Sequence, residues 1–198
     1  MKTTICLIRH GQTDWNKQFL IQGTIDNPLN ETGRKQAKDT ALLIQNFDIT
    51  FDILLSSPLI RAYETMEIIK NNLSLSGDIK TMNSLQEREF GDLEGKKVCE
   101  ESYNLMYSEK VNGLEKLKDL QIRAINTLKE IAMQYPGKKV LVTTHSQFIK
   151  GVLSYLINDF DFTSIIKNSS LNFFEVENNQ IKALHYNICE YKKTYSLD

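Results

Sequence analysis

The hydrophobic positions of the chain form short runs that alternate with longer stretches of helical spacing. Apolar runs at 5–8, 52–56 and 139–145 each predict a buried β-strand. Between them, apolar residues recur three and four positions apart, which is typical of a helix with one face on a core. The predicted helices span 30–47, 59–73, 98–108, 113–134 and 147–157.

The remaining segments predict the rest of the sheet. A weaker strand is expected at 79–85, and the runs 171–177 and 180–187 predict a hairpin, since Asn178-Asn179 suits a type I′ turn. The polar tail 190–198 is expected to fray. Strands that alternate with helices favour a three-layer α/β/α fold with a mostly parallel central sheet, in a single domain over 1–198.

Composition narrows the range of partners. The chain has 24 basic and 25 acidic residues and a net charge of −1, so no overall field favours nucleic acid or an anionic membrane. No apolar run approaches the roughly 20 residues of a membrane span. The N-terminus lacks a secretory pattern, and the three cysteines are widely spaced, so we expect a cytoplasmic protein.

Polar residues of the kind found in reactive sites follow four predicted strands. Arg9 and His10 end the first strand, and Arg61 comes shortly after the second. Glu87 follows the third strand, and His145 ends a strand of the same design as the first. The carboxyl ends of parallel strands meet at one edge of a sheet. These five side chains are therefore expected to converge.

Two arginines beside two histidines suit a dianionic phosphate better than a metal ion. A nucleophilic imidazole must be neutral, and a nearby guanidinium disfavours the imidazolium form of His10. The other ring nitrogen is expected to donate to a backbone carbonyl. Arg9, Arg61 and a protonated His145 would hold the phosphate oxygens. Glu87, with a raised pKa, would protonate the leaving group and then activate water.

The segments that carry these residues resemble, in order, the sequence blocks of the histidine phosphatase superfamily, also called the phosphoglycerate mutase-like family. An Arg-His-Gly tripeptide alone would be weak evidence, but five ordered blocks over about three quarters of the chain are a strong signal. The blocks are Leu7–Asn16, Gln22-Gly23 with Asp26–Leu29, Ser56–Ala62 with Thr65, Leu85–Glu87 with Gly91, and Val142–His145.

The resemblance implies that His10 is the phosphorylated residue and that Glu87 is the proton donor. It implies no metal and no organic cofactor. Ser146 departs from the family pattern, which more often has glycine after the second histidine, although serine still supplies the backbone N–H. The implied phosphate pocket consists of Arg9, Asn16, Gln22, Gly23, Arg61, His145 and Ser146.

Hydrolysis of a small phosphomonoester is the favoured function, by a monomer or a homodimer. Sugar phosphates, phosphoglycerates and ribazole phosphate all stay open as substrates. A cofactor-dependent phosphoglycerate mutase is the first alternative, but such mutases usually carry paired arginines in an insertion, and 89–122 contains no arginine. A catalytically silent binding module is the second, and it would predict loss of His10, an arginine or Glu87.

Several other charged residues are given less active roles. Glu89 is a competing carboxylate for the acid role, because it would share a strand face with the residue two positions earlier. Arg88 is then expected to point to solvent. Arg34 and Arg123 are expected to be surface charges on helices, and His185 is expected to be structural.

Overall fold

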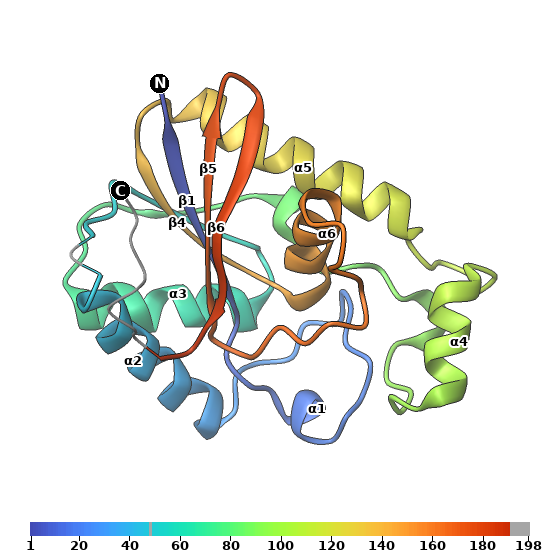
Figure 1. The fold of residues 1–198 in the computed structure, drawn as a ribbon. Coiled ribbons are helices and arrows are strands. Elements are labelled where there is room, and N and C mark those ends of the chain that lie inside the picture. Colours follow the sequence, from blue (N-terminus) through green and yellow to red (C-terminus); the bar gives the residue numbers. More distant parts are fainter. Residues whose placement is uncertain (48, 191–198) are drawn as a thin grey trace.

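A single six-stranded sheet forms the centre of the molecule (Figure 1). The structure is a computed structural model that describes residues 1–47 and 49–190. The spatial order is β3-β2-β4-β1-β5-β6; the first four strands are parallel, and the β5–β6 hairpin runs antiparallel at one edge. The strands are β1 (Thr3–Arg9), β2 (Ile53–Ser56), β3 (Ile79–Thr81), β4 (Lys139–Thr144), β5 (Leu171–Glu177) and β6 (Gln180–Ile188).

Helices cover both faces of this sheet, which confirms the expected three-layer α/β/α fold (Figure 1). Helices α2 and α3 pack on one face, α5 and α6 on the other, and α4 stands to the side. Within 1–47 and 49–190, no helix is long and apolar enough to cross a bilayer. The helices are α1 (Asp14–Lys17), α2 (Glu31–Gln45), α3 (Ile60–Leu73), α4 (Glu100–Ser108), α5 (Leu117–Gln134) and α6 (Ser146–Leu156).

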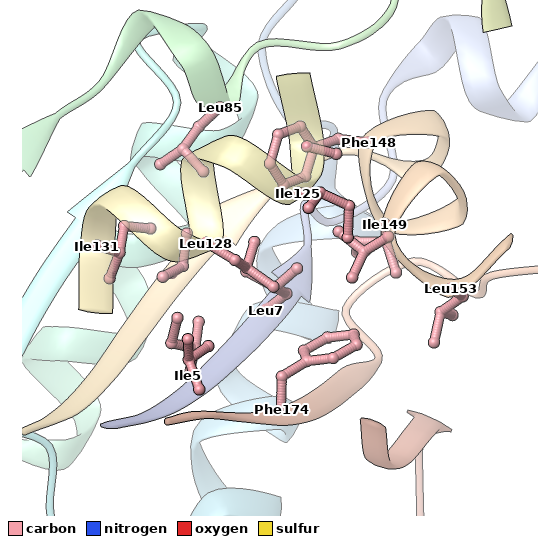
Figure 2. Packing of buried hydrophobic residues seen from close by; sticks show 14 of the residues in the cluster. Ile5, Leu7, Leu85, Ile125, Leu128, Ile131, Phe148, Ile149, Leu153 and Phe174 are labelled. Atoms are coloured by element: carbon pink, nitrogen blue, oxygen red, sulfur yellow. The ribbon is translucent and has the colours of Figure 1, made fainter. Parts of the chain in front are cut away.

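The continuous apolar run of β1 reflects its place between two helical layers. Ile5 and Leu7 pack beneath α5 and α6, where Figure 2 shows them close to Leu128 and Ile149. The alternate residues, including Ile8, belong to the core beneath α2 and α3. A strand buried on both faces is apolar at every position, because no side of it meets water.

Three local features differ from the sequence expectation. The strand expected over 79–85 ends at Thr81, because the chain turns into a 3-10 helix at Asn83–Leu85 that buries Leu85. The segment between the predicted strand 5–8 and the predicted helix 30–47, for which no element was expected, contains the short helix α1, which begins with a capping box between Thr13 and Asn16. The helix expected from residue 113 begins at Leu117.

Other expectations are confirmed or lie out of reach. Asn178 and Asn179 have φ values of 50° and 64°, as a type I′ turn requires. From residue 191 onward, the tail that was expected to fray lies outside the described residues. The parallel register pairs Arg9 with Thr144, and Ser56 with Thr143. The carboxyl ends of β1, β4 and β2 therefore lie side by side, and the residues that follow these strands share one edge of the sheet.

Candidate active site

A cavity of about 520 Å³ opens at this edge of the sheet. Arg61 and His145 lie directly behind it and are completely buried. Gly23 does not line the cavity, but its carbonyl contacts Arg61. The other expected site residues all border the cavity: Arg9, His10, Asn16, Gln22, Glu87 and Ser146.

The imidazole of His10 is held in one tautomer. Its Nδ1 lies 2.6 Å from the carbonyl oxygen of Gly11, which can only accept a hydrogen bond. The proton is therefore on Nδ1, and Nε2 keeps its lone pair. Burial lowers the pKa of His10 well below its usual value, and the Arg61 and Arg9 guanidinium groups lower it further. The direction of this shift agrees with the neutral imidazole expected from the sequence.

Arg61 is fixed against the same ring by the loop that follows α1. Its Nε lies 3.3 Å from His10 Nε2, and Nη2 donates to the Gly23 carbonyl at 2.7 Å. With its amide oriented to satisfy both neighbours, Gln22 accepts from Arg61 Nε at 2.9 Å. Burial lowers the pKa of Arg61 to about 10, so the group stays charged at neutral pH.

Gly23 is required at this position by close packing. A Cβ atom there would lie 2.1 Å from Oε1 of Glu94 and 2.9 Å from the carbonyl oxygen of Arg88. Glu94 is itself held in place, since its carboxylate accepts from the backbone N–H groups of Thr24 and Ile25. The Gly23 carbonyl can therefore reach Arg61 only because this position has no side chain.

The basic wall of the site consists of Arg61, Arg9 and His145. Arg9 Nη1 donates to the carbonyl of Ile166 at 2.5 Å, and burial lowers the pKa of Arg9 to about 10. His145 Nε2 lies 2.8 Å from Ser57 Oγ, and the two histidine rings meet edge to face at 5.2 Å. Burial, and then the charge of Arg61, lower the pKa of His145 well below its usual value. The direction of this shift favours the neutral ring in this arrangement, whereas the sequence led us to expect a protonated His145.

Glu87 sits at the N-terminus of α6. Its Oε1 accepts from the backbone N–H groups of Arg88 and Gln147, both at 3.0 Å, and of Phe148 at 3.3 Å. Within the described residues, its Oε2 accepts one hydrogen bond, from the Gln147 N–H at 3.3 Å. Burial raises the pKa of Glu87, although these N–H groups and the arginines oppose the rise. A buried carboxyl group with one lightly bonded oxygen is suited to carry a proton.

Asn16 and Ser146 both border the cavity, although they lie far apart in the sequence. Asn16 Oδ1 accepts from Asn168 Nδ2 at 3.3 Å. Ser146 is the first residue of α6 and directly precedes Gln147, which binds Glu87. Gln147 also lines the cavity, and its Oε1 is buried without a hydrogen-bond partner in the described part of the chain.

Two expectations for arginines are wrong. Arg88 is 1% exposed and donates to the carbonyls of Glu115 and Met106, at 2.8 and 3.1 Å. The strand that would have turned Arg88 outward ends at Thr81, so the alternation fails. Arg123 is no free surface charge either: it is bonded to the Glu115 carboxylate at 2.7 Å and to the carbonyls of the segment before Glu87.

Three other residues that the sequence analysis considered do not line the cavity: Arg34, Glu89 and His185. Arg34 pairs with Glu64 on the surface. Glu89 is exposed and does not border the main cavity, whereas Glu87 does, so the structure brings the preferred carboxylate to the site. His185 lies in β6 and is not among the cavity-lining residues.

Sequence reasoning missed two polar neighbours of the histidines. Ser57, which contacts His145, lies inside the Ser56–Ala62 block. A serine before a proline is also typical of the end of a strand, so the sequence did not single it out. Asn168 donates to the His10 carbonyl at 2.9 Å, yet it lies in an irregular segment with no recognisable pattern.

The site combines an imidazole held in one tautomer, two guanidinium groups and a buried carboxyl group with a raised pKa. Within the described ranges, no group of three or more His, Cys, Asp or Glu side chains could hold a metal ion. A negatively charged group with tetrahedral oxygens fits this chemistry, because guanidinium groups bind phosphate oxygens strongly.

Comparisons with known proteins agree with this geometry. The family model of the histidine phosphatase superfamily (branch 1) matches residues 5–189. The "Uncharacterized phosphatase PhoE" of Bacillus subtilis is 35% identical over 190 residues, which are 94% of this chain and 95% of that protein. A "2,3-bisphosphoglycerate-dependent phosphoglycerate mutase" of Allorhizobium ampelinum is 34% identical over 170 residues, 79% of this chain and 80% of that protein.

The fold is likewise shared with a solved structure. The crystal structure of a phosphoglycerate mutase from Bacillus anthracis superposes with a TM-score of 0.80 at 21% identity, covering 95% of this chain and 94% of that one. This likeness concerns the fold alone, while the family model and the sequence identities reach further. The chain belongs to the histidine phosphatase superfamily, branch 1.

Proposed function

We propose that this protein hydrolyses small phosphomonoesters through a phosphohistidine at His10. The observation that carries the proposal is the state of that ring. Nδ1 is bound to the Gly11 carbonyl, and Nε2 keeps its lone pair beside the Arg61 guanidinium. A neutral imidazole fixed next to permanent cations can attack phosphorus without first losing a proton.

The first step forms a bond from His10 Nε2 to phosphorus and breaks the bond from phosphorus to the leaving oxygen. Glu87 delivers its proton to that oxygen, with Oε2 as the proposed donor because it is the less bonded carboxyl oxygen. Water then attacks the phosphohistidine, Glu87 takes up its proton, and inorganic phosphate leaves with the ring neutral again.

The basic wall stabilises the charge in both steps. Arg9 and Arg61 are the proposed permanent ligands of the phosphate oxygens. A dianion beside His145 would raise the pKa of that ring, so we propose that His145 gains its proton as substrate binds. The remaining proposed pocket groups are Asn16, Gln22, the Gly23 backbone and the Ser146 N–H.

Hydrolysis is favoured over the mutase reaction by the outer part of the cavity. A bisphosphorylated intermediate needs cations for its second phosphate. Among the described residues that line the cavity, Lys17 is the one lysine or arginine apart from Arg9. Apolar side chains also line the cavity, among them those of Phe19, Met106 and Ile165. This lining supports a substrate with one phosphate and a partly apolar body.

The same proposal covers the cell compartment and the assembly. A cytoplasmic monomer or homodimer that acts on a sugar phosphate, a phosphoglycerate or a ribazole phosphate would fit the site and the free thiols of Cys6, Cys99 and Cys189. Sedimentation of the purified protein would test the assembly.

Hydrolysis of an aryl phosphate, in excess chelator and with or without vanadate, tests the reaction. The wild type should be active with chelator and inhibited by vanadate, and His10→Ala should be inactive. Activity that requires added metal, or that survives His10→Ala, would contradict the phosphohistidine mechanism. Conversion of 3- to 2-phosphoglycerate faster than phosphate release would instead identify a mutase.

A further inference from the structure

The irregular segment 157–170, which connects α6 to β5, contacts two residues of the proposed phosphate site, Arg9 and His10. Ile166 accepts from Arg9 Nη1 at 2.5 Å, and Asn168 donates to the His10 carbonyl at 2.9 Å. Within this segment, Ile165 is 75% exposed. Arg9 is thus oriented by a segment that is neither helix nor strand, and side-chain hydrogen bonds contribute to fixing that segment.

The carboxamide of Asn187, near the end of β6, fixes the segment on both sides of Ile166. Asn187 Nδ2 donates to the Ile165 carbonyl at 2.9 Å, and Asn187 Oδ1 accepts from the Lys167 N–H at 2.8 Å. One side chain thereby bonds to the residues directly before and after the one that holds Arg9. The pairing resembles that of a neighbouring strand, and it restricts the direction of the Ile166 carbonyl.

Asn187 is itself placed by an irregularity in the sheet. The register pairs Leu171 with Ile188 and Phe173 with His185, so two β6 residues stand opposite Asn172. Asn187 has a φ of 55°, and its N–H donates to Asn172 Oδ1 at 2.8 Å. Such a bulge redirects a side chain away from the normal alternation. Here it turns the carboxamide toward the segment that holds Arg9.

We propose that Asn187 is a positioning residue for Arg9, acting through Ile166. The inference rests on the proposed role of Arg9 as a phosphate ligand. Asn187 is not itself among the residues that line the cavity, although it bonds to one of them, Ile165. When its two hydrogen bonds are lost, the Ile166 carbonyl is free to turn, Arg9 loses its fixed orientation, and the site binds phosphate less tightly.

Asn187→Gly tests this proposal with little disturbance of the backbone, because glycine accepts the left-handed conformation without strain. Asn179→Gly is the matched control, since Asn179 also has a positive φ, 64°, at the far end of the same hairpin. The measurements are the vanadate inhibition constant, KM, kcat and the melting temperature. Asn187→Gly should raise the vanadate constant about tenfold, while Asn179→Gly should leave it unchanged.

A double-mutant cycle with Arg9→Ala separates positioning from general weakening. In the Arg9→Ala protein, Asn187→Gly should change the vanadate constant by less than about twofold. Asn187→Asp serves as a second variant: it keeps an acceptor for Lys167 and loses the donor to Ile165, so an intermediate rise is expected.

The outcomes distinguish the two proposals. If Asn187→Gly and Asn187→Asp lower only the melting temperature and bind vanadate like the wild type, the positioning role is wrong. The same conclusion follows if the effects of Asn187→Gly and Arg9→Ala are independent. If Arg9→Ala itself binds vanadate normally, the proposed phosphate role of Arg9 fails, and the role of Asn187 fails with it.

Discussion

Replacing Glu87 with glutamine removes the transferable proton and keeps nearly every contact. From the part of the chain that the structure describes, Oε1 accepts three backbone hydrogen bonds, from Arg88, Gln147 and Phe148, whereas Oε2 accepts one, at 3.3 Å. A glutamine oxygen can take the place of Oε1, with the amide nitrogen in the place of Oε2. The variant should therefore fold normally, and its loss of rate should report the missing acid.

The magnitude depends on the leaving group. General acid catalysis contributes about 10²- to 10⁴-fold when the leaving group is a poor one. The kcat/KM for an alkyl phosphate should therefore fall by about that factor in Glu87→Gln, whereas the kcat/KM for an aryl phosphate, whose leaving group needs little protonation, should fall less than about tenfold. This ratio excludes the later attack of water, in which Glu87 has its second role. Steady-state kinetics on an alkyl and an aryl phosphate, with Glu89→Gln as the control, measure the difference.

The pH dependence of kcat/KM gives a second, independent test of Glu87 as the acid. Burial raises the pKa of Glu87, so its acid form persists to higher pH than that of an exposed glutamate. The wild-type kcat/KM should fall on the alkaline side as this carboxyl group ionises, and Glu87→Gln should lack that limb. The low pKa of His10 keeps the nucleophile neutral on the acid side. Equal losses on both substrates, or a larger loss in Glu89→Gln, would refute the assignment of the acid.

Three further perturbations test the surroundings of the site. Gly23→Ala should lower the free energy of unfolding in urea by about 1–3 kcal/mol, because the new Cβ would lie 2.1 Å from Glu94 Oε1. It should also weaken vanadate binding, because the clash would displace the carbonyl that holds Arg61. Arg123→Lys should cost about 1–3 kcal/mol in the same assay, because a lysine cannot serve both the Glu115 carboxylate and the carbonyls of the preceding segment; unchanged stability would contradict this role. Dialysis against a chelator should leave kcat unchanged, and a loss restored by a divalent metal would argue for a different chemistry.

The sequence predicted the parts of the fold that depend on short-range patterns. The buried run of β1, the helical spacing of α3 and the Asn178-Asn179 turn all appear where expected. Each has a local cause: double-sided burial, one apolar helix face, or residues that accept positive φ. The convergence of Arg9, His10 and His145 followed because parallel strands end at one edge.

What could not be predicted depends on contacts between distant segments. Arg88 was expected in solvent because an extended strand was assumed, and its burial follows from carbonyls that only the folded α4 and the loop before α5 bring to it. The charge state of His145 depends on burial, which a linear pattern does not reveal. The hold of Asn187 on the segment around Ile166 arises from a bulge, which leaves no periodic signal in the sequence.

Identification of the covalent intermediate tests the central claim most directly. Wild-type protein mixed with a phosphomonoester, quenched within one turnover in alkaline denaturant and digested, should carry an acid-labile, base-stable phosphate on the peptide that contains His10. Glu87→Gln should accumulate more of this species with an aryl phosphate, because water attack then lacks its base, and His10→Ala should carry none. Phosphate on His145 or on a serine, or full turnover without any phosphorylated His10 peptide, would contradict the account.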